Sequence, residues 1–179
     1  MRKQPEITNK TRQALIDVFC ELYSQKPIEK ITVQEIANKS GYNRSTFYQY
    51  FTDVYDLLDF MENDILDYIH ENAHNKEQTD PQGILLLFEE KELYLHALLS
   101  DYGNIRFIEK LKREFFSDKL DYCIPKDSSM TPYLLEFNIS TAFSLIRLWQ
   151  RRQKDLPPEQ LFRLIDTLVN SGTSSIQKK

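Results

Sequence analysis

The sequence predicts an all-α protein with a three-helix N-terminal domain and a larger helical C-terminal domain. Apolar residues recur three and four positions apart almost throughout the 179 residues, which is the spacing of amphipathic helices rather than the alternation of strands. Only four glycines are present. A chain of this length fits one or two small domains, which bury a sizeable core only if they pack together.

The first helix is expected to begin near Thr8 and to end near Ser24, ahead of Pro27. A short extended or turn segment then leads into Thr32. Three short helices of about fifty residues form a marginal core, so the N-terminal domain is expected to rest on the remainder of the chain. The apolar stripe of the first helix is formed by Ala14, Leu15, Val18, Phe19 and Leu22.

A helix-turn-helix is predicted between Thr32 and Phe51. Thr32 is a suitable N-cap for the first helix, and Glu35, three residues on, would complete a capping box. Ser40-Gly41 should end that helix, because glycine readily adopts the positive φ that a turn between two crossed helices needs. Two helices joined in this way also occur in proteins that never touch DNA, so the pattern alone does not decide the function.

The second helix of the pair opens at Asn43 or Arg44. Phe47 and Phe51 lie four residues apart and turn inward together, which leaves hydroxyl, amide and phenol groups on the outside with no acidic residue among them. Such a face suits the phosphates and base edges of a major groove. Arg44 is expected to pair with guanine and Gln49 with adenine, whereas the phenols and a threonine hold phosphates. The expected DNA-contacting residues are Thr32, Asn43, Arg44, Ser45, Thr46, Tyr48, Gln49 and Tyr50.

A long helix capped by Asp53 should follow and continue to about Ala73. Its end spells His-Glu-Asn-Ala-His at 70–74, the HExxH pattern in which two histidines hold zinc and the glutamate acts as general base. The flanking residues are polar where a catalytic helix should be apolar, and a pattern with three fixed positions arises by chance. We therefore expect a solvated helix end and no enzymatic activity, catalytic residue, metal site or cofactor. A zinc hydrolase is the enzyme alternative.

Asp80-Pro81 should open a further helix that reaches about Leu99, and a turn at 101–104 precedes another that ends near Phe116. Residues 117–131 are expected to be mostly loop. Aromatic side chains of the C-terminal domain could line a pocket for a small-molecule effector, although aromatics at helical spacing are core residues more often, and a buried core position suits the histidine among them. The candidate pocket residues are Phe88, Tyr94, His96, Tyr102, Phe107 and Phe143.

Thr131-Pro132 opens the most apolar helix of the chain, with two apolar stripes that must both be buried. One stripe can face the core of its own subunit and the other a second subunit. A last helix should start within 155–158 and end at Gly172. Two such helices from each subunit would build a four-helix dimer interface, for which we expect Leu135, Ile139, Ala142, Ile146, Trp149, Leu161, Leu164, Ile165 and Leu168.

Charge is unevenly distributed along the chain. The formal net charge is −4, yet residues 1–52 carry eight basic and five acidic side chains, a net +3, which leaves −7 on the remainder. A weakly positive domain on an acidic remainder would turn toward phosphate. Two cysteines, Cys20 and Cys123, are too few for a disulfide framework. The longest apolar run, 84–88, is too short to span a membrane, and we expect a cytoplasmic protein.

Four segments resemble the DNA-binding domain of the TetR family of bacterial transcription regulators: Thr-Val-Gln-Glu-Ile-Ala at 32–37, Ser-Gly-Tyr at 40–42, Ser-Thr-Phe-Tyr-Gln-Tyr-Phe at 45–51 and Asp-Leu-Leu at 56–58. The resemblance is specific over about residues 8–60. At lower specificity, the segments 92–111 and 133–172 resemble the short C-terminal domain common among regulators from Gram-positive bacteria.

The resemblance implies a homodimer in which residues 1–52 bind double-stranded DNA and residues 53–179 dimerise and bind an effector. It implies a sequence-specific regulator, a ligand-responsive repressor acting on a near-palindromic operator. Many members carry a lysine directly after the position of Phe51, where it meets a phosphate, but Thr52-Asp53 stand here. The alternative, which this departure favours, is a TetR-like coactivator or adaptor that binds proteins without binding DNA.

Overall fold

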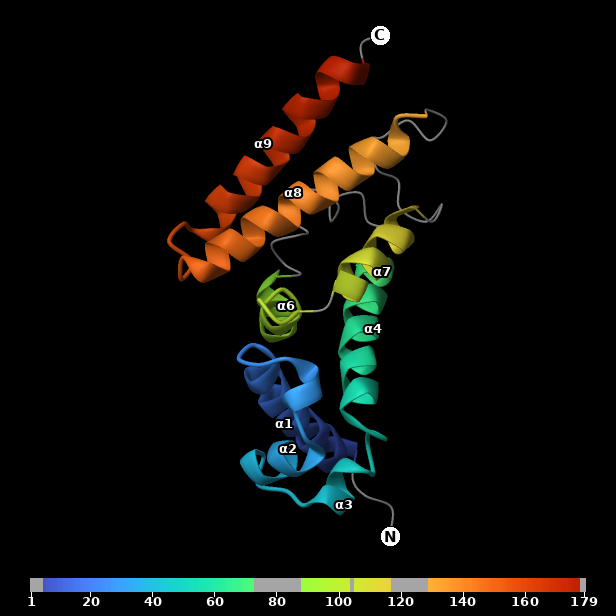
Figure 1. Cartoon of the computed structure of the whole chain (residues 1–179), viewed down its shortest axis with the longest axis vertical. Helices are drawn as coiled ribbons and strands as arrows, with labels where there is room; N and C mark the ends of the chain where they lie inside the picture. The colour runs from blue at the N-terminus through green and yellow to red at the C-terminus, as the bar shows by residue number, and fades with distance from the viewer. Residues whose placement is uncertain (1–4, 73–87, 104, 117–128, 178–179) are drawn as a thin grey trace. The chain divides into compact units, whose positions relative to one another are not determined.

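The computed structural model describes residues 5–72, 88–103, 105–116 and 129–177, and every regular element within these ranges is helical. The all-α prediction is therefore confirmed for this part of the chain (Figure 1). In chain order the elements are α1 (Pro5–Tyr23), the 3-10 turn η1 (Ile28–Lys30), α2 (Val33–Lys39), α3 (Arg44–Phe47), α4 (Val54–Asn72), α6 (Glu92–Leu98), α7 (Ile105–Phe116), α8 (Thr131–Arg151) and α9 (Pro158–Gln177).

The chain forms two compact units. The first comprises Met1–Ile65 and Glu92–Phe107, and the second comprises Leu66–Lys91 and Ile108–Lys179. This grouping differs from the expected division after residue 52, because α6 packs on α1 and the first part of α4 shares their core. The functional division into a DNA-binding and a dimerising domain stays a prediction.

The core of the first unit is built on α1, which packs against α2 and α6. Phe19 and Tyr23 of α1 stack with ring centroids 5.4 Å apart, and the Ser100 hydroxyl after α6 donates to the Tyr23 carbonyl at 3.3 Å. Of the predicted stripe of α1, Leu15, Phe19 and Leu22 are buried in this core, and the other two residues are half-buried. Since burial supplies most of the stabilisation of such short helices, α6 completes a core that the three N-terminal helices alone would leave open. The largest fully buried residues of the first unit are Leu15, Ile16, Phe19, Tyr23, Ile36, Phe47, Leu57, Met61, Ile65, Leu98, Leu99 and Phe107.

In the second unit, α8 packs along α9 (Figure 1). Phe88 fills the space beside them, with its ring centroid 5.1 Å from that of Phe162 and 6.5 Å from that of Trp149. The Trp149 indole donates to the Leu156 carbonyl at 2.7 Å, which fixes the turn between the two helices. On the other side of α8, Lys112 of α7 forms an ion pair with Glu136 at 2.7 Å.

Three sequence expectations need correction. The histidine at position 96 is exposed rather than buried, because its neighbours Tyr94, Leu95, Ala97 and Leu98 take the core-facing side of α6 and leave it on the opposite side. The last helix continues to Gln177 instead of ending at Gly172. The first helix begins earlier than expected, at Pro5, a residue that the first turn of a helix accepts.

Some expectations lie outside the described residues: Cys123, the helix start at 80–81 and most of the loop at 117–131. Among the helices that the structure does describe, none is long and apolar enough to cross a membrane.

Candidate nucleic-acid interface

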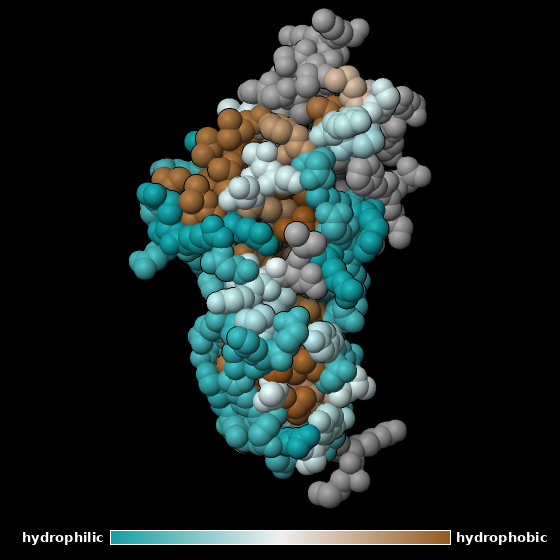
Figure 2. All heavy atoms as spheres, viewed as in Figure 1, coloured by the Kyte–Doolittle hydropathy of each residue, from teal (hydrophilic) through white to brown (hydrophobic). Residues whose placement is uncertain are grey.

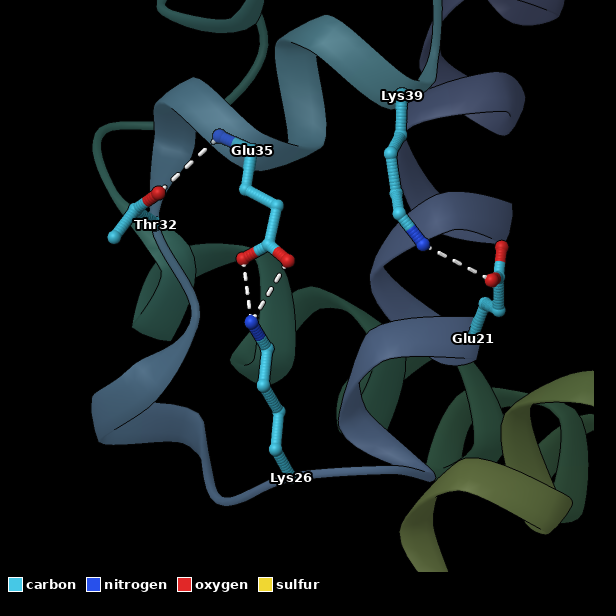
Figure 3. Close-up of polar contacts among 5 residues, drawn as sticks. All are labelled: Glu21, Lys26, Thr32, Glu35 and Lys39. Carbon is cyan, nitrogen blue, oxygen red and sulfur yellow. Dashed lines mark hydrogen bonds and ion pairs between the residues drawn. The ribbon is translucent and has the colours of Figure 1, made fainter.

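The N-terminus of α2 is capped as the sequence predicts. The Thr32 hydroxyl accepts a hydrogen bond from the Glu35 backbone N–H at 3.2 Å. The reciprocal half of the predicted capping box is wrong, because the Glu35 carboxylate binds the Lys26 ammonium instead, at 2.6 and 2.8 Å (Figure 3). A cation nine residues earlier in the chain is a stronger partner for a carboxylate than a backbone N–H.

A second ion pair ties α2 to α1. Lys39, at the end of α2, lies 3.1 Å from a carboxylate oxygen of Glu21 in α1 (Figure 3). Together with Lys26 and Glu35, this pair fastens both ends of α2 to the preceding part of the first unit. Two of the eight basic side chains of residues 1–52 are therefore paired with two of the five acidic ones, which leaves the net charge at +3 but engages these two ammonium groups within the protein.

The turn between α2 and α3 depends on Gly41, which has a φ of +75°. The Tyr42 N–H donates to the Ala37 carbonyl at 2.9 Å, and the Ser40 hydroxyl donates to the same carbonyl at 3.1 Å, so the end of α2 is closed by both backbone and side chain. A Cβ at Gly41 would meet no atom within 4 Å. The backbone conformation, rather than a lack of space, is therefore what favours glycine here.

The second helix, α3, is a single turn held at its start by Asn43. The Asn43 Oδ1 atom accepts from the Thr46 N–H at 2.8 Å and from the hydroxyls of Ser45 and Thr46 at 2.7 and 2.9 Å. Because a backbone N–H can only donate, this atom is the carbonyl oxygen of the amide. Asn43 is thus the N-cap, and its acceptor oxygen is committed to the protein.

The inner side of α3 is anchored by two aromatic rings, as predicted. Phe47 is fully buried, and its ring centroid lies 5.7 Å from that of Phe51. Phe51 lies 5.7 Å from Phe60 of α4. The helix is shorter than expected and ends at Phe47. The outer side is formed by Ser45 of α3 together with Gln49 and the 49% exposed Tyr48 of the following turn, with Thr46 and Tyr50 half-buried at its edges. The face that the sequence assigns to DNA is therefore not covered by the described residues of the first unit.

Arg44 and Tyr48 form a pair on this outer side. The Arg44 Nη2 atom donates to the Tyr48 phenol oxygen at 3.1 Å, and its guanidinium carbon lies 5.8 Å from the centre of the Tyr48 ring. Their spacing of four residues places them on one side of a helical turn. The sequence analysis assigned the two residues separate tasks, although this spacing already indicated a contact.

The start of α4 is capped from both sides. Asp53 Oδ1 accepts from the backbone N–H groups of Tyr55 and Asp56 at 2.8 and 2.9 Å, which confirms Asp53 as the cap. Asp56 reaches back to the Thr52 N–H at 2.7 Å and to its hydroxyl at 3.1 Å. The sequence analysis missed Asp56, whose position three residues after Asp53 has capping-box spacing. The two donors of Thr52 are consequently used within the protein.

Residues 15–59 match the family model of bacterial regulatory proteins of the tetR family. The N-terminal part of the chain is therefore a TetR-family DNA-binding domain. The chain is a DNA-binding transcriptional regulator with an N-terminal helix-turn-helix, and the prediction that it is not an enzyme agrees with this family of regulators.

Solved structures share this fold over nearly the whole chain. A TetR transcriptional regulator from Streptococcus agalactiae 2603V is 24% identical, with a TM-score of 0.62 over 92% of this chain and 96% of that one. The dihydroxyacetone kinase operon activator DhaS is 19% identical, with a TM-score of 0.58 over 92% and 96%. A transcriptional regulator from Aquifex aeolicus VF5 is 16% identical, with a TM-score of 0.56 over 93% and 99%. A comparison with curated proteins found no match.

The candidate effector residues of this TetR-family chain fall in both units. Tyr94 and Phe107 are buried in the first unit, where His96 and Tyr102 are exposed. His96 and Tyr94 point to opposite sides of α6, so they cannot line one pocket together. In the second unit, Phe88 is buried and Phe143 is half-buried. The effector site stays a prediction.

The predicted dimer residues are divided between buried and exposed positions of α8 and α9. Within the single chain, Ile146, Trp149, Leu161 and Ile165 belong to the core of the second unit. Ile139 and Ala142 are half-buried, Leu164 and Leu168 are exposed, and the side chain of Leu135 lies outside the described residues. For the HExxH pattern, His70 ends α4, His74 is outside the described residues, and the described side chains form no cluster that could hold a metal ion.

Proposed function

We propose that this TetR-family chain is a sequence-specific repressor that binds a near-palindromic operator as a homodimer and is released by a small molecule. The observation that carries the DNA-binding part is the outer side of α3. It presents Ser45, Tyr48 and Gln49 to solvent while Phe47 and Phe51 hold the helix from within. A helix with this division of faces can enter a major groove without any rearrangement of its own core.

Base readout is assigned to Arg44 and Gln49. A guanidinium pairs with the two acceptors of guanine, and a carboxamide pairs with the donor and acceptor of adenine. Tyr50, at the edge of the exposed side, is assigned to a phosphate, which positions the protein without reading sequence. The Thr46 hydroxyl donates to Asn43 Oδ1, so the phosphate contact that the sequence suggested for Thr46 would require this hydrogen bond to break. Replacing Arg44 or Gln49 with alanine should relax preference at one base pair by ~1–3 kcal/mol.

Dimerisation is assigned to the exposed apolar side of α8 and α9. Phe137, Leu148, Leu164 and Leu168 each expose more than two fifths of their surface in the single chain. Figure 2 shows apolar atoms gathered over this part of the molecule. An exposed apolar patch on two long helices favours packing against the same two helices of a second subunit. A two-fold dimer would then place its two recognition helices about 34 Å apart, which is one turn of DNA.

Release by an effector and repression, rather than activation, rest on the family resemblance. The structurally similar DhaS is an operon activator, and comparing expression from the recovered operator with and without the protein distinguishes repression from activation. Since the target is chromosomal DNA, the proposed place of action is the cytoplasm.

The test is a selection of bound duplexes from a random DNA pool with the purified full-length protein. Recovery of a near-palindrome with half-sites one helical turn apart is expected. Leu168→Glu should give monomers in size-exclusion chromatography with light scattering and lose cooperative binding. Leu93→Glu is the matched control, because Leu93 is 42% exposed on α6 and Leu168 is 43% exposed on α9. If the bound duplexes share no sequence, the proposed sequence-specific binding is wrong. If Leu168→Glu still forms a dimer, the proposed dimer interface is wrong.

The second candidate is an adaptor that binds a protein in place of DNA. Its support is that Asp56 occupies the donors of Thr52, and that Lys26 and Lys39 are neutralised by ion pairs. Binding of random duplex DNA across a salt series separates the two functions, because a DNA-binding protein loses affinity steeply as salt rises and an adaptor binds none.

The same salt series can show whether Lys39 is held away from phosphate. Glu21→Gln removes the partner of Lys39 and should steepen the slope of log affinity against log salt by about 0.9 per protomer. Glu29→Gln removes the same charge from an exposed position of η1 to which the described residues give no ion pair. Equal slopes for the two variants would place Lys39 out of reach of the backbone.

A further inference from the structure

We propose that Tyr48 is a positioning residue for Arg44 and that the two side chains read one G·C base pair as a unit. The inference rests on the proposed DNA readout by Arg44 and deepens it. The sequence alone suggested a different task for Tyr48, a direct contact to phosphate.

The first step is geometric. The Tyr48 N–H donates to the Arg44 carbonyl at 3.0 Å, so the backbone itself sets the two residues one helical turn apart. The Arg44 guanidinium then reaches the Tyr48 phenol oxygen at 3.1 Å and lies over the ring at 5.8 Å. A hydrogen bond and a cation–π contact together restrict a side chain that otherwise has four rotatable bonds.

The second step concerns which groups remain for DNA. In the pair, the phenol oxygen accepts from Arg44, so this hydrogen bond leaves the phenol proton and the other guanidinium N–H groups available as donors. Guanine offers two acceptors, O6 and N7, on its major-groove edge, whereas adenine and cytosine each place an amino donor there. A surface made of donors alone matches guanine.

The third step excludes the neighbouring side chains from the same task. Asn43 uses its acceptor oxygen for the cap of α3, and the hydroxyls of Ser45 and Thr46 donate to that oxygen. A hydroxyl that donates inward presents only lone pairs outward, which suit an amino group and not an acceptor. At the start of α3, the side chains with donors left are therefore Arg44, Tyr48 and the amide nitrogen of Asn43, and of these only Arg44 and Tyr48 contact each other.

Preorganisation is the physical advantage of this pair. An arginine that is ordered before binding loses less conformational entropy when it meets a base. Removal of the phenol oxygen should then weaken the correct base pair more than the incorrect ones, because only the correct one uses the guanidinium in its held orientation.

The experiment uses the full-length protein and the duplex recovered from the random pool, together with duplexes that change one base pair at a time. Tyr48→Phe keeps the ring and removes the phenol oxygen, and Tyr48→Leu removes both contacts. At one G·C pair, preference should fall by about 2- to 10-fold for Tyr48→Phe and further for Tyr48→Leu. Arg44→Ala should lower preference at the same base pair by about 5- to 100-fold. The double variant Arg44→Ala/Tyr48→Phe should show the same preference at this base pair as Arg44→Ala alone.

Tyr55→Phe is the matched control. Tyr55 is a half-exposed tyrosine at the start of α4, and its loss of a phenol oxygen should leave base preference unchanged. Circular dichroism of each variant checks that the first unit stays folded.

Two outcomes would overturn the inference, and they differ. If Tyr48→Phe weakens all duplexes by one factor and leaves the salt slope unchanged, Tyr48 is an uncharged phosphate contact, and the proposed readout by Arg44 stands without it. If Arg44→Ala weakens all duplexes equally, or the protein shows no preference for any duplex, the proposed readout fails and this inference fails with it.

Discussion

The replacement of Asn43 by alanine tests whether one side chain holds the recognition helix. Loss of an N-cap costs about 0.5–2 kcal/mol in proteins. The upper half of this range applies here, because Oδ1 accepts three hydrogen bonds and α3 is a four-residue helix with no further turns to compensate. Local opening of α3 should therefore become about 8 to 30 times more frequent.

Hydrogen exchange is the assay for this opening. The amides of Thr46, Phe47 and Tyr48 take part in the hydrogen bonds of α3 and its cap, so their exchange should accelerate by that factor. Trp149, the only tryptophan, belongs to the second unit, and its fluorescence should report unchanged unfolding there. Unchanged amide exchange in Asn43→Ala would refute the role of the cap.

Asn43→Asp separates the cap from DNA recognition. Aspartate caps as well as asparagine, so amide exchange should return to that of the natural chain. Its added negative charge should nevertheless weaken binding to every duplex, most strongly at low salt. A loss of preference at a single base pair in Asn43→Ala would instead show that the DNA contact suggested by the sequence for this residue is made to a base.

Three further predictions concern stability and metal binding. Phe47→Ala should destabilise the first unit by about 3–5 kcal/mol, because Phe47 is fully buried; a cost below about 1 kcal/mol in denaturant titrations would contradict the packing described. Burial raises the pKa of Tyr94 from its usual 10 to about 12, which favours the neutral phenol in the folded protein. Its contribution to stability should therefore be complete below pH 10 and lost as the pH rises to 12, and Tyr94→Phe should flatten this loss in alkaline unfolding followed by circular dichroism. Elemental analysis of the purified protein should find no stoichiometric zinc at the His70-to-His74 pattern, and one zinc per chain would contradict the reading of that pattern as chance.

Features that depend on neighbours within four residues could be predicted from the sequence. Thr32, Asn43 and Asp53 cap three helices, and each is recognisable because its partner is the backbone of the next turn. The inward rings of Phe47 and Phe51 follow from their spacing alone. These local signals sufficed to place the helix-turn-helix.

Features that depend on a distant partner could not be predicted. Glu35 has capping-box spacing, but its carboxylate meets Lys26, and only the folded chain shows which competitor lies closer. The two stripes of α8 are equally apolar in sequence. Tertiary packing buries Ile146 and Trp149 with Phe88 and leaves Phe137 and Leu148 outside, a choice that periodicity does not contain.

The same local hydrogen bonds that make the interface predictable also restrict what it can recognise. Asn43, Asp53 and Asp56 satisfy the donors at the starts of α3 and α4, so the interface needs no ordering when DNA arrives. Each donor bound in this way is one that no phosphate can use. Sequence preference is then assigned to Arg44 and Gln49, whose guanidinium and carboxamide groups suit guanine and adenine. Changes at these two positions should therefore alter the preferred operator without altering the fold that presents them.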